Sequence, residues 1–194
     1  MKIGLFGGTF DPPHLGHIRL ALYVLNEKNL QKVMLVPAYK TPYDDKQSTV
    51  SFEHRFSMAK LAVEAHPDLE VSDIEGKRGG QSYTIDTIRQ LKKLYGLSSE
   101  ELYLIVGADG FLRFSEWKEP ESILTECRVC VLKRNDIDSK NYNNEFLKKA
   151  ELLDNDFYDV SSRELRNRIA NGDDLGDLID SGVSEYIREN GLYV

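Results

Sequence analysis

Short apolar runs alternate along this chain with segments whose apolar residues recur at helical spacing. The runs with the residue types of strands are Lys2–Phe6, Lys32–Pro37, Leu69–Ile74, Leu102–Val106, Arg128–Lys133 and Phe157–Val160. Strands that alternate with helices favour a mostly parallel sheet covered on both faces, because each helix returns the chain to the edge where the next strand begins. We therefore expect residues 1–194 to form a single α/β domain, doubly wound and Rossmann-like.

Three segments place apolar residues along one face of a helix. The predicted faces are Leu15, Ile18, Ala21, Leu22 and Leu25, then Phe56, Ala59, Ala62 and Val63, then Ile85, Ile88, Leu91 and Leu94. Thr84 is expected to cap the third helix, and Gly96 to end it. The spacing from Ser161 to Glu164 is typical of a capping box, and Ser184 and Gly191 are expected to begin and end the last helix.

Composition and charge argue against two classes of partner. The chain has 25 Lys and Arg residues against 32 Asp and Glu residues, so it lacks the overall basic character of a nucleic-acid-binding protein. No stretch approaches the roughly 18 apolar residues of a membrane helix, and Met1–Lys2 leads into a glycine turn rather than a signal peptide. We expect a cytoplasmic protein with no nucleic-acid partner and no membrane partner.

The chain has two cysteines, Cys127 and Cys130, at a spacing that suits a redox pair or half of a zinc site. They border a predicted buried strand, on which residues three apart point to opposite faces. A second cysteine pair to complete a zinc site is missing from the sequence. We therefore favour two core thiols, and we expect no metal site built by the protein.

The strongest functional signal is the run Gly7–His17, which follows the first predicted strand and leads into the first predicted helix. Gly7 and Gly8 allow a phosphate to approach the backbone closely, and a helix N-terminus favours an anion. His14 and His17 add donors at the same end of the helix. The alternative is a tight turn whose histidines only cap the helix, but the two histidines beside the glycines favour phosphate chemistry.

Two signatures give this run a family resemblance. The run Gly7–His17 resembles the GGTFDPxHxGH motif of the His-x-Gly-His nucleotidyltransferase superfamily. Ser161–Arg166 resembles the second motif of that superfamily, Ser-Ser-Thr-x-Ile-Arg, with Arg163 in place of the threonine. Arg163 leaves the helix cap intact, and it either adds a cation near a triphosphate or points to water.

Three further segments narrow the resemblance to the bacterial nicotinate-nucleotide adenylyltransferases. Gly80–Thr87 is similar to the Gly-x-Ser-Tyr-Thr-x-Asp-Thr block of that family, and Val106–Asp109 with the later Trp117 is similar to its Ile-Gly-Ala-Asp block and tryptophan. The ending Glu189–Tyr193 also resembles that of the family. The blocks occur in the family's order along the whole chain.

The resemblance implies adenylyl transfer from ATP to nicotinate mononucleotide, which yields deamido-NAD and pyrophosphate in NAD biosynthesis. The 5′-phosphate of the mononucleotide would attack the α-phosphorus directly and in line, with no covalent enzyme intermediate. His14, His17 and Arg166 would be catalytic, by stabilising charge on the phosphates. Mg²⁺ is expected to bind through the ATP phosphates.

The resemblance also implies two sets of binding residues. The ATP-binding set is Gly7, Gly8, Thr9, Phe10, Gly16, Gly107, Asp109, Ser161 and Ser162. The set for the pyridine nucleotide is Tyr83, Thr84, Trp117, Lys40 and Arg134. Trp117 would stack on the pyridine ring, and N–H groups at Thr84 would receive the nicotinate carboxylate.

One loop departs from the family pattern. The family's Pro-Asn-x-x-Pro-Pro-His-Lys corresponds here to Pro37–Asp44, which lacks the Asn, His and Lys in register, so Lys40 or Lys46 would supply the missing charge. The polar segment Tyr39–Val50 would be a mobile lid, and the polar segment Asn135–Asn144 would be surface.

Three alternatives stay open at this point. Phosphopantetheine adenylyltransferases and cytidylyltransferases share the first motif, although the Gly80–Thr87 block and Trp117 argue against both. Nicotinamide mononucleotide is an alternative acceptor because of the altered loop. A nucleotide sensor without catalysis is a third reading, against which the intact His14 and His17 argue. The sequence leaves the oligomeric state open, a homodimer included.

Overall fold

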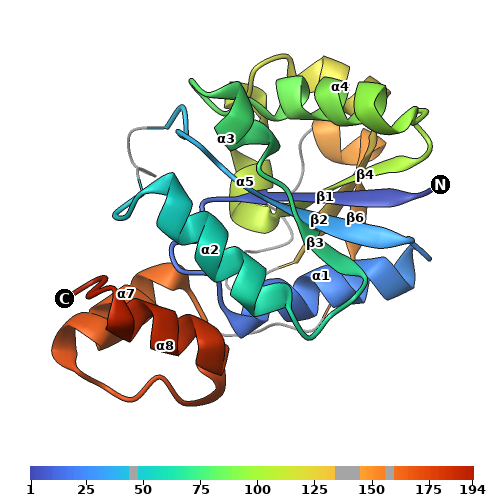
Figure 1. Cartoon of the computed structure of the whole chain (residues 1–194). Coiled ribbons are helices and arrows are strands. Elements are labelled where there is room, and N and C mark those ends of the chain that lie inside the picture. Colours follow the sequence, from blue (N-terminus) through green and yellow to red (C-terminus); the bar gives the residue numbers. More distant parts are fainter. Residues whose placement is uncertain (44–47, 134–144, 156–159) are drawn as a thin grey trace.

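The computed structural model describes residues 1–43, 48–133, 145–155 and 160–194. Six strands within these residues form one parallel sheet in the order β3-β2-β1-β4-β5-β6 (Figure 1). The strands are β1 (Ile3–Gly8), β2 (Lys32–Pro37), β3 (Leu69–Val71), β4 (Leu102–Gly107), β5 (Arg128–Leu132) and β6 (Glu151–Leu153). The prediction of a doubly wound, Rossmann-like sheet is confirmed.

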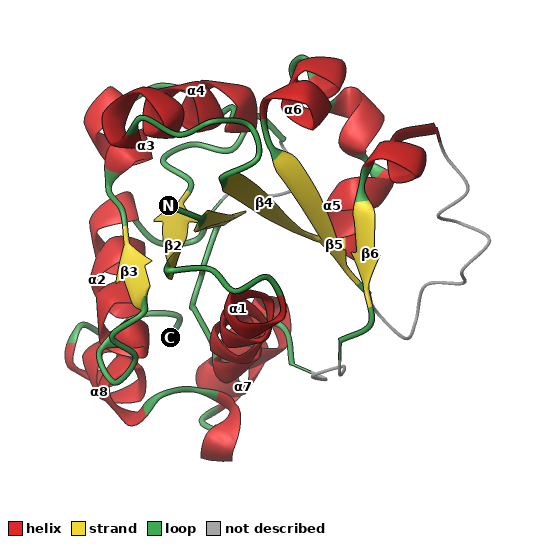
Figure 2. Ribbon diagram, turned by 90° about the vertical axis from the view of Figure 1, so that its right-hand side faces the viewer, coloured by secondary structure: helices red, strands yellow, loops and turns green. Residues whose placement is uncertain are grey.

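Helices cover both faces of the sheet. They are α1 (Leu15–Glu27), α2 (Phe52–Val63), α3 (Ile74–Arg78), α4 (Thr84–Tyr95), α5 (Ala108–Leu112), α6 (Pro120–Glu126), α7 (Ser162–Asn171) and α8 (Ser181–Glu189). Figure 2 shows α1, α2, α7 and α8 on one side of the sheet, and α3, α4 and α6 on the other. In the described part of the chain, no helix has the length and apolar character needed to cross a bilayer.

Each face of the sheet has its own layer of buried apolar side chains. On one face, Ile18 and Ala21 of α1 share a cluster with Met58 of α2. On the other face, Ile85 and Ile88 of α4 pack with residues of the central strands. The predicted apolar faces of α1, α2 and α4 are therefore confirmed in most positions, but Leu15 and Phe56 are only half-buried and Leu94 is 67% exposed. Leu94 lies in the last turn of α4, outside the buried stripe.

Five of the predicted strands are confirmed; β2 has the predicted bounds, and the other four have shifted ends. β3 stops at Val71, because the chain turns at Ser72 and Ile74 already begins α3. The sixth strand, β6, was not predicted, since only three residues of it pair with β5. The segment predicted in its place, Phe157–Val160, lies outside the described residues except for Val160.

Two of the predicted helix caps are wrong and three are confirmed. Tyr83, not Thr84, is the N-cap of α4, and Thr84 is its first helical residue. Asp180, not Ser184, caps α8, because its carboxylate accepts from Gly182 N–H at 2.8 Å. Ser161 caps α7 as predicted, and Gly96 and Gly191 follow their helices with positive φ.

Both cysteines are buried free thiols, as predicted. Cys130 packs on the α1 face of the sheet, whereas Cys127 packs on the α4 face. Burial raises the pKa of each thiol to about 12, so both stay protonated at neutral pH.

Candidate active site

A cavity opens beside the carboxyl ends of β1 and β4, the two central strands of the sheet. The chain winds from β1 toward β3 on one side and from β4 toward β6 on the other, so the strand order reverses between them. Ligands of doubly wound sheets bind at this reversal. The cavity has a volume of about 230 Å³, and its lining includes Gly7, Gly8, Thr9 and Gly107.

His14 and His17 form a reciprocal cap at the N-terminus of α1, in the turn that follows β1. The N–H of His17 donates to His14 Nδ1 at 3.4 Å, and the N–H of His14 donates to His17 Nδ1 at 3.2 Å. The two rings stack with centroids 3.6 Å apart. Because each Nδ1 accepts a hydrogen bond, each neutral ring carries its proton on Nε2. Capping and ligand binding are therefore compatible, since they use different nitrogens of the same ring.

The environment keeps both rings neutral at pH 7. Burial lowers the pKa of His14 from 6.5 to about 4. Burial lowers the pKa of His17 well below its usual value, and the neighbouring charge of protonated His14 lowers it further. The ring of Phe10 packs edge-to-face against the ring of His17, with the ring centroids 5.0 Å apart. The pair thus offers two neutral Nε2–H donors at pH 7.

Gly16 allows the histidine pair to form. A Cβ at Gly16 would lie 2.8 Å from a methyl carbon of Val160 and 3.0 Å from Nδ1 of His14. The first separation is shorter than real Cβ contacts and the second is tight, so a larger residue would displace Val160 and press on the ring of His14.

The second sequence signature lies directly against this turn. Ser162, the first residue of α7, donates its hydroxyl to the carbonyl of Pro12 at 2.8 Å. Arg166 donates Nη1 to the carbonyl of Asp11 at 2.7 Å. Ser161 accepts from the N–H of Glu164 at 3.2 Å and so caps α7. The structure therefore brings together two predicted segments that are about 150 residues apart in sequence.

Three of the predicted pyridine-nucleotide residues line the same cavity as the glycines of the turn. They are Tyr83, Thr84 and Trp117. Trp117 packs on Phe114 with ring centroids 5.2 Å apart, which leaves its ring at the cavity wall. Thr84 belongs to the first turn of α4, where backbone N–H groups have no helical acceptor.

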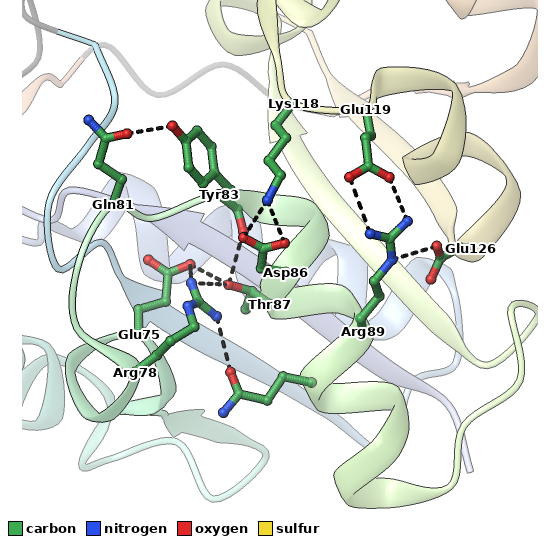
Figure 3. Close-up of polar contacts among 11 residues, drawn as sticks. Glu75, Arg78, Gln81, Tyr83, Asp86, Thr87, Arg89, Lys118, Glu119 and Glu126 are labelled. Carbon is green, nitrogen blue, oxygen red and sulfur yellow. Dashed lines mark hydrogen bonds and ion pairs between the residues drawn. The ribbon is translucent and has the colours of Figure 1, made fainter.

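Polar contacts fasten α4 to its neighbours on this side (Figure 3). Lys118 donates to both carboxylate oxygens of Asp86 at 3.0 Å, and its ammonium lies 4.8 Å from the centre of the Tyr83 ring. Thr87 donates its hydroxyl to the buried Glu75 at 2.6 Å and accepts from Arg78 at 3.0 Å. The segment that carries Trp117 is thereby tied to the first turn of α4.

Further residues of the sequence prediction are Lys40, Asp109, Arg134, Lys46 and Arg163. Lys40 is exposed and is absent from the lining of the cavity as the structure describes it, and its carbonyl accepts from the N–H of Ser82 at 2.8 Å. Asp109 lies in the first turn of α5, behind the Gly107 cap. Arg134 and Lys46 are outside the described residues. Arg163 is exposed on α7.

Sequence reasoning missed the buried Arg55, which supports the turn from α2. Arg55 is 1% exposed and donates to the carbonyl of Thr9 at 2.8 Å. Burial lowers the pKa of its guanidinium, and the nearby charge of Asp11 opposes that shift. Its helical spacing to Met58 and Ala62 could have revealed its burial, since all three lie on one face of α2.

This chain is similar over most of its length to known proteins. A family model described as cytidylyltransferase-like matches residues 5–168. A curated "Probable nicotinate-nucleotide adenylyltransferase" of Dictyoglomus thermophilum is 38% identical over 198 residues and covers 100% of both chains. A protein of the same description from Borreliella burgdorferi is 37% identical and covers 100% of this chain and 97% of its own.

A solved structure matches the fold over nearly its whole length. The nicotinic acid mononucleotide adenylyltransferase of Plasmodium falciparum, complexed with NaAD, superposes with a TM-score of 0.80 at 22% identity. The match covers 99% of this chain and 97% of that one.

Proposed function

This chain belongs to the nicotinate-nucleotide adenylyltransferases, and on that basis we propose a role for each site residue. The reaction is adenylyl transfer from ATP to nicotinate mononucleotide. The observation that carries the proposal is the reciprocal cap of His14 and His17 on α1, in the same turn as Gly7, Gly8 and Thr9, which line the cavity. It leaves two Nε2–H donors beside the glycine turn, where a triphosphate can reach backbone N–H groups as well.

We propose that the phosphates of ATP bind at this turn. The reaction needs no protein nucleophile, because the 5′-phosphate of the mononucleotide is itself the attacking group and pyrophosphate leaves. Catalysis then depends on holding the two nucleotides in line and on stabilising charge at the α-phosphorus. His14 and His17 would donate to phosphate oxygens as that charge grows. Arg166 would add a positive charge from α7, and the N-terminus of α7 at Ser161 and Ser162 would add N–H donors.

The pyridine nucleotide would bind on the Trp117 side of the cavity. Trp117 presents a flat ring for stacking on the electron-poor pyridine. The first turn of α4 at Thr84 offers N–H donors and the positive end of a helix dipole to a carboxylate. Lys118, which lines the same cavity, adds a cation. These features support nicotinate over the uncharged nicotinamide as the acceptor.

A divalent cation would come with ATP rather than with the protein. Among the described residues, no group of three or more His, Cys, Asp or Glu side chains could hold a metal ion. Mg²⁺ binds readily to nucleotide phosphates and keeps several waters, so the donor set of this cavity fits an ion carried on the triphosphate. Such an ion would neutralise charge on the phosphates.

A pyrophosphate-release assay tests the proposed function. ATP would be combined in turn with nicotinate mononucleotide, nicotinamide mononucleotide and phosphopantetheine. We expect the highest kcat/KM with nicotinate mononucleotide, a lower value with nicotinamide mononucleotide and no release with phosphopantetheine. Tight ATP binding without release for any acceptor would contradict the proposal and support a nucleotide sensor instead.

A further inference from the structure

The buried carboxylate of Asp11 joins the catalytic turn to two distant parts of the chain. Asp11 is 3% exposed. Its Oδ2 accepts from the N–H of Thr49 at 2.7 Å and from the hydroxyl of Thr49 at 2.8 Å. Its Oδ1 accepts from the hydroxyl of Tyr193 at 2.7 Å, across 182 residues of sequence. Three donors therefore converge on the Asp11 carboxylate. This carboxylate takes part neither in the capping of α1 nor in the proposed phosphate contacts.

Tyr193 adopts a backbone conformation that side chains rarely take. The φ of Tyr193 is +67°, in the left-handed region where the Cβ crowds the backbone. Gly191, two residues earlier, also has a positive φ, of +57°. A bulky residue remains in that region only when the surrounding structure holds it there. The hydroxyl bond to Asp11 is such a restraint. Burial and this bond raise the pKa of the Tyr193 hydroxyl, which therefore stays protonated as a donor.

The backbone between Asp11 and the histidines transmits the position of that carboxylate. Pro12 and Pro13 link Asp11 to His14, and proline rings fix φ, so this link is short and stiff. The carbonyls of Asp11 and Pro12 are held from α7 by Arg166 and Ser162. A shift of Asp11 would therefore move His14, and the reciprocal cap would carry the movement to His17.

We propose that Tyr193 is a positioning residue for adenylyl transfer, acting through the Asp11 carboxylate on the orientation of His14 and His17. The proposal rests on the proposed function of those histidines as phosphate ligands. Displacing a reacting group by about 1 Å can lower a rate about a hundredfold. Loss of one of the three donors on Asp11 should move the turn less than that, so a reduction in kcat of about tenfold is expected.

The test compares two tyrosines from the same end of the fold. Tyr193→Phe removes the hydroxyl that binds Asp11. Tyr186→Phe is the matched control, because it removes a hydroxyl of α8 that bonds Nδ1 of His54 at 3.0 Å, away from the turn. We expect Tyr193→Phe to lower kcat about tenfold with KM values for both substrates within twofold of wild type. Tyr186→Phe should keep the wild-type kcat.

A second readout separates positioning from general support of the fold and does not depend on turnover. Nitrogen NMR of the histidine side chains reports the tautomer and hydrogen bonding of His14 and His17. We expect their resonances to change in Tyr193→Phe and to stay unchanged in Tyr186→Phe. Thr49→Val, which removes another hydroxyl from Asp11, should give a smaller change of the same kind.

The results that overturn the proposal differ from those that overturn the proposed function. Equal kcat values and equal histidine resonances in the two tyrosine variants would show that Tyr193 does not position the turn. An equal loss of kcat and of melting temperature in both variants would assign Tyr193 a general structural role. A wild-type protein without pyrophosphate release would refute the proposed function, whereas the histidine spectra would still test the positioning.

Discussion

The two sides of the cavity are held by different kinds of contact. The turn at His14 and His17 rests on buried polar groups, among them Arg55 of α2 at 1% exposure and Asp11 of the turn itself at 3% exposure. The Trp117 side combines one buried contact, from Thr87 to Glu75, with ion pairs at the surface, such as Lys118 with Asp86, whose side chains are 40% and 31% exposed. Truncating a buried polar group leaves its partner unsatisfied, whereas an exposed ion pair contributes little. We therefore expect the turn, as the fixed side, to hold its geometry more tightly than the Trp117 side, where we propose that the acceptor binds.

The largest expected effect tests the fixed side. His17→Ala should lower kcat by about 10²–10³-fold, since loss of one donor to a developing charge costs about 2.7–4 kcal/mol. The effect should be equal with either pyridine nucleotide, because the histidine acts on ATP. Steady-state pyrophosphate release measures it, and circular dichroism checks the fold.

His54→Ala provides a matched control for that variant. His54 lies on α2 and bonds Tyr186, so its loss should leave kcat unchanged. A folded His17→Ala protein with turnover near that of wild type would remove the turn from the mechanism.

Acid should weaken the fixed side before the exposed pairs matter. His14 and His17 have depressed pKa values in the folded protein, so the unfolded chain binds more protons below pH 6.5. Stability is therefore fully present above about pH 6.5 and falls as the pH approaches 4, with a slope of up to about 1.4 kcal/mol per pH unit for each titrating histidine. Urea unfolding at pH 7, 6 and 5 measures it. His14→Gln should show a shallower loss, and parallel profiles would contradict the burial argument.

An intermediate effect is expected on the acceptor side. Trp117→Ala should raise KM for nicotinate mononucleotide about tenfold, because ring stacking adds about 0.5–1.5 kcal/mol beyond the buried area. KM for ATP should stay within twofold of wild type, and Trp117→Phe should recover most of the loss. Equal changes in both KM values would mean that the two sides of the cavity are not separate.

The smallest expected effect sharpens the role of charge at the acceptor side. Lys118→Met should lower the preference for nicotinate over nicotinamide mononucleotide by about two- to fivefold, because exposed charges contribute about 0.2–1 kcal/mol. Arg89→Met is the control, since Arg89 pairs with Glu119 and Glu126 outside the described cavity lining. The ratio of kcat/KM values measures the effect, and an unchanged ratio would leave selectivity to the first turn of α4.

Periodicity predicted most of the fold because burial on a sheet face repeats along the chain. It failed where an element is short or a polar residue is buried. β6 pairs over only three residues, too few for a pattern. Ser184 has the residue type of a helix cap, but Asp180, a stronger acceptor four residues earlier, is the N-cap of α8. Arg55 lies on the buried face of α2, but its guanidinium donates to the carbonyl of Thr9, a partner that the helical pattern does not identify.

The candidate site could be predicted only as far as its motifs extend. His14, His17 and Ser162 stand in recognisable patterns, and the structure brings these residues to one turn. The Asp11–Tyr193 bond joins residues 182 positions apart, and no local pattern in one sequence reports such a contact. Contacts of this kind emerge only when the chain is folded.

The central claim is that ATP phosphates meet the Nε2 atoms of His14 and His17 at the glycine turn. A crystal structure with a non-hydrolysable ATP analogue and nicotinate mononucleotide tests it most directly. We predict phosphate oxygens within hydrogen-bond distance of both Nε2 atoms, with each Nδ1 still accepting from the backbone and the pyridine ring against Trp117. A triphosphate bound on the Trp117 side, away from both histidines, would contradict the claim.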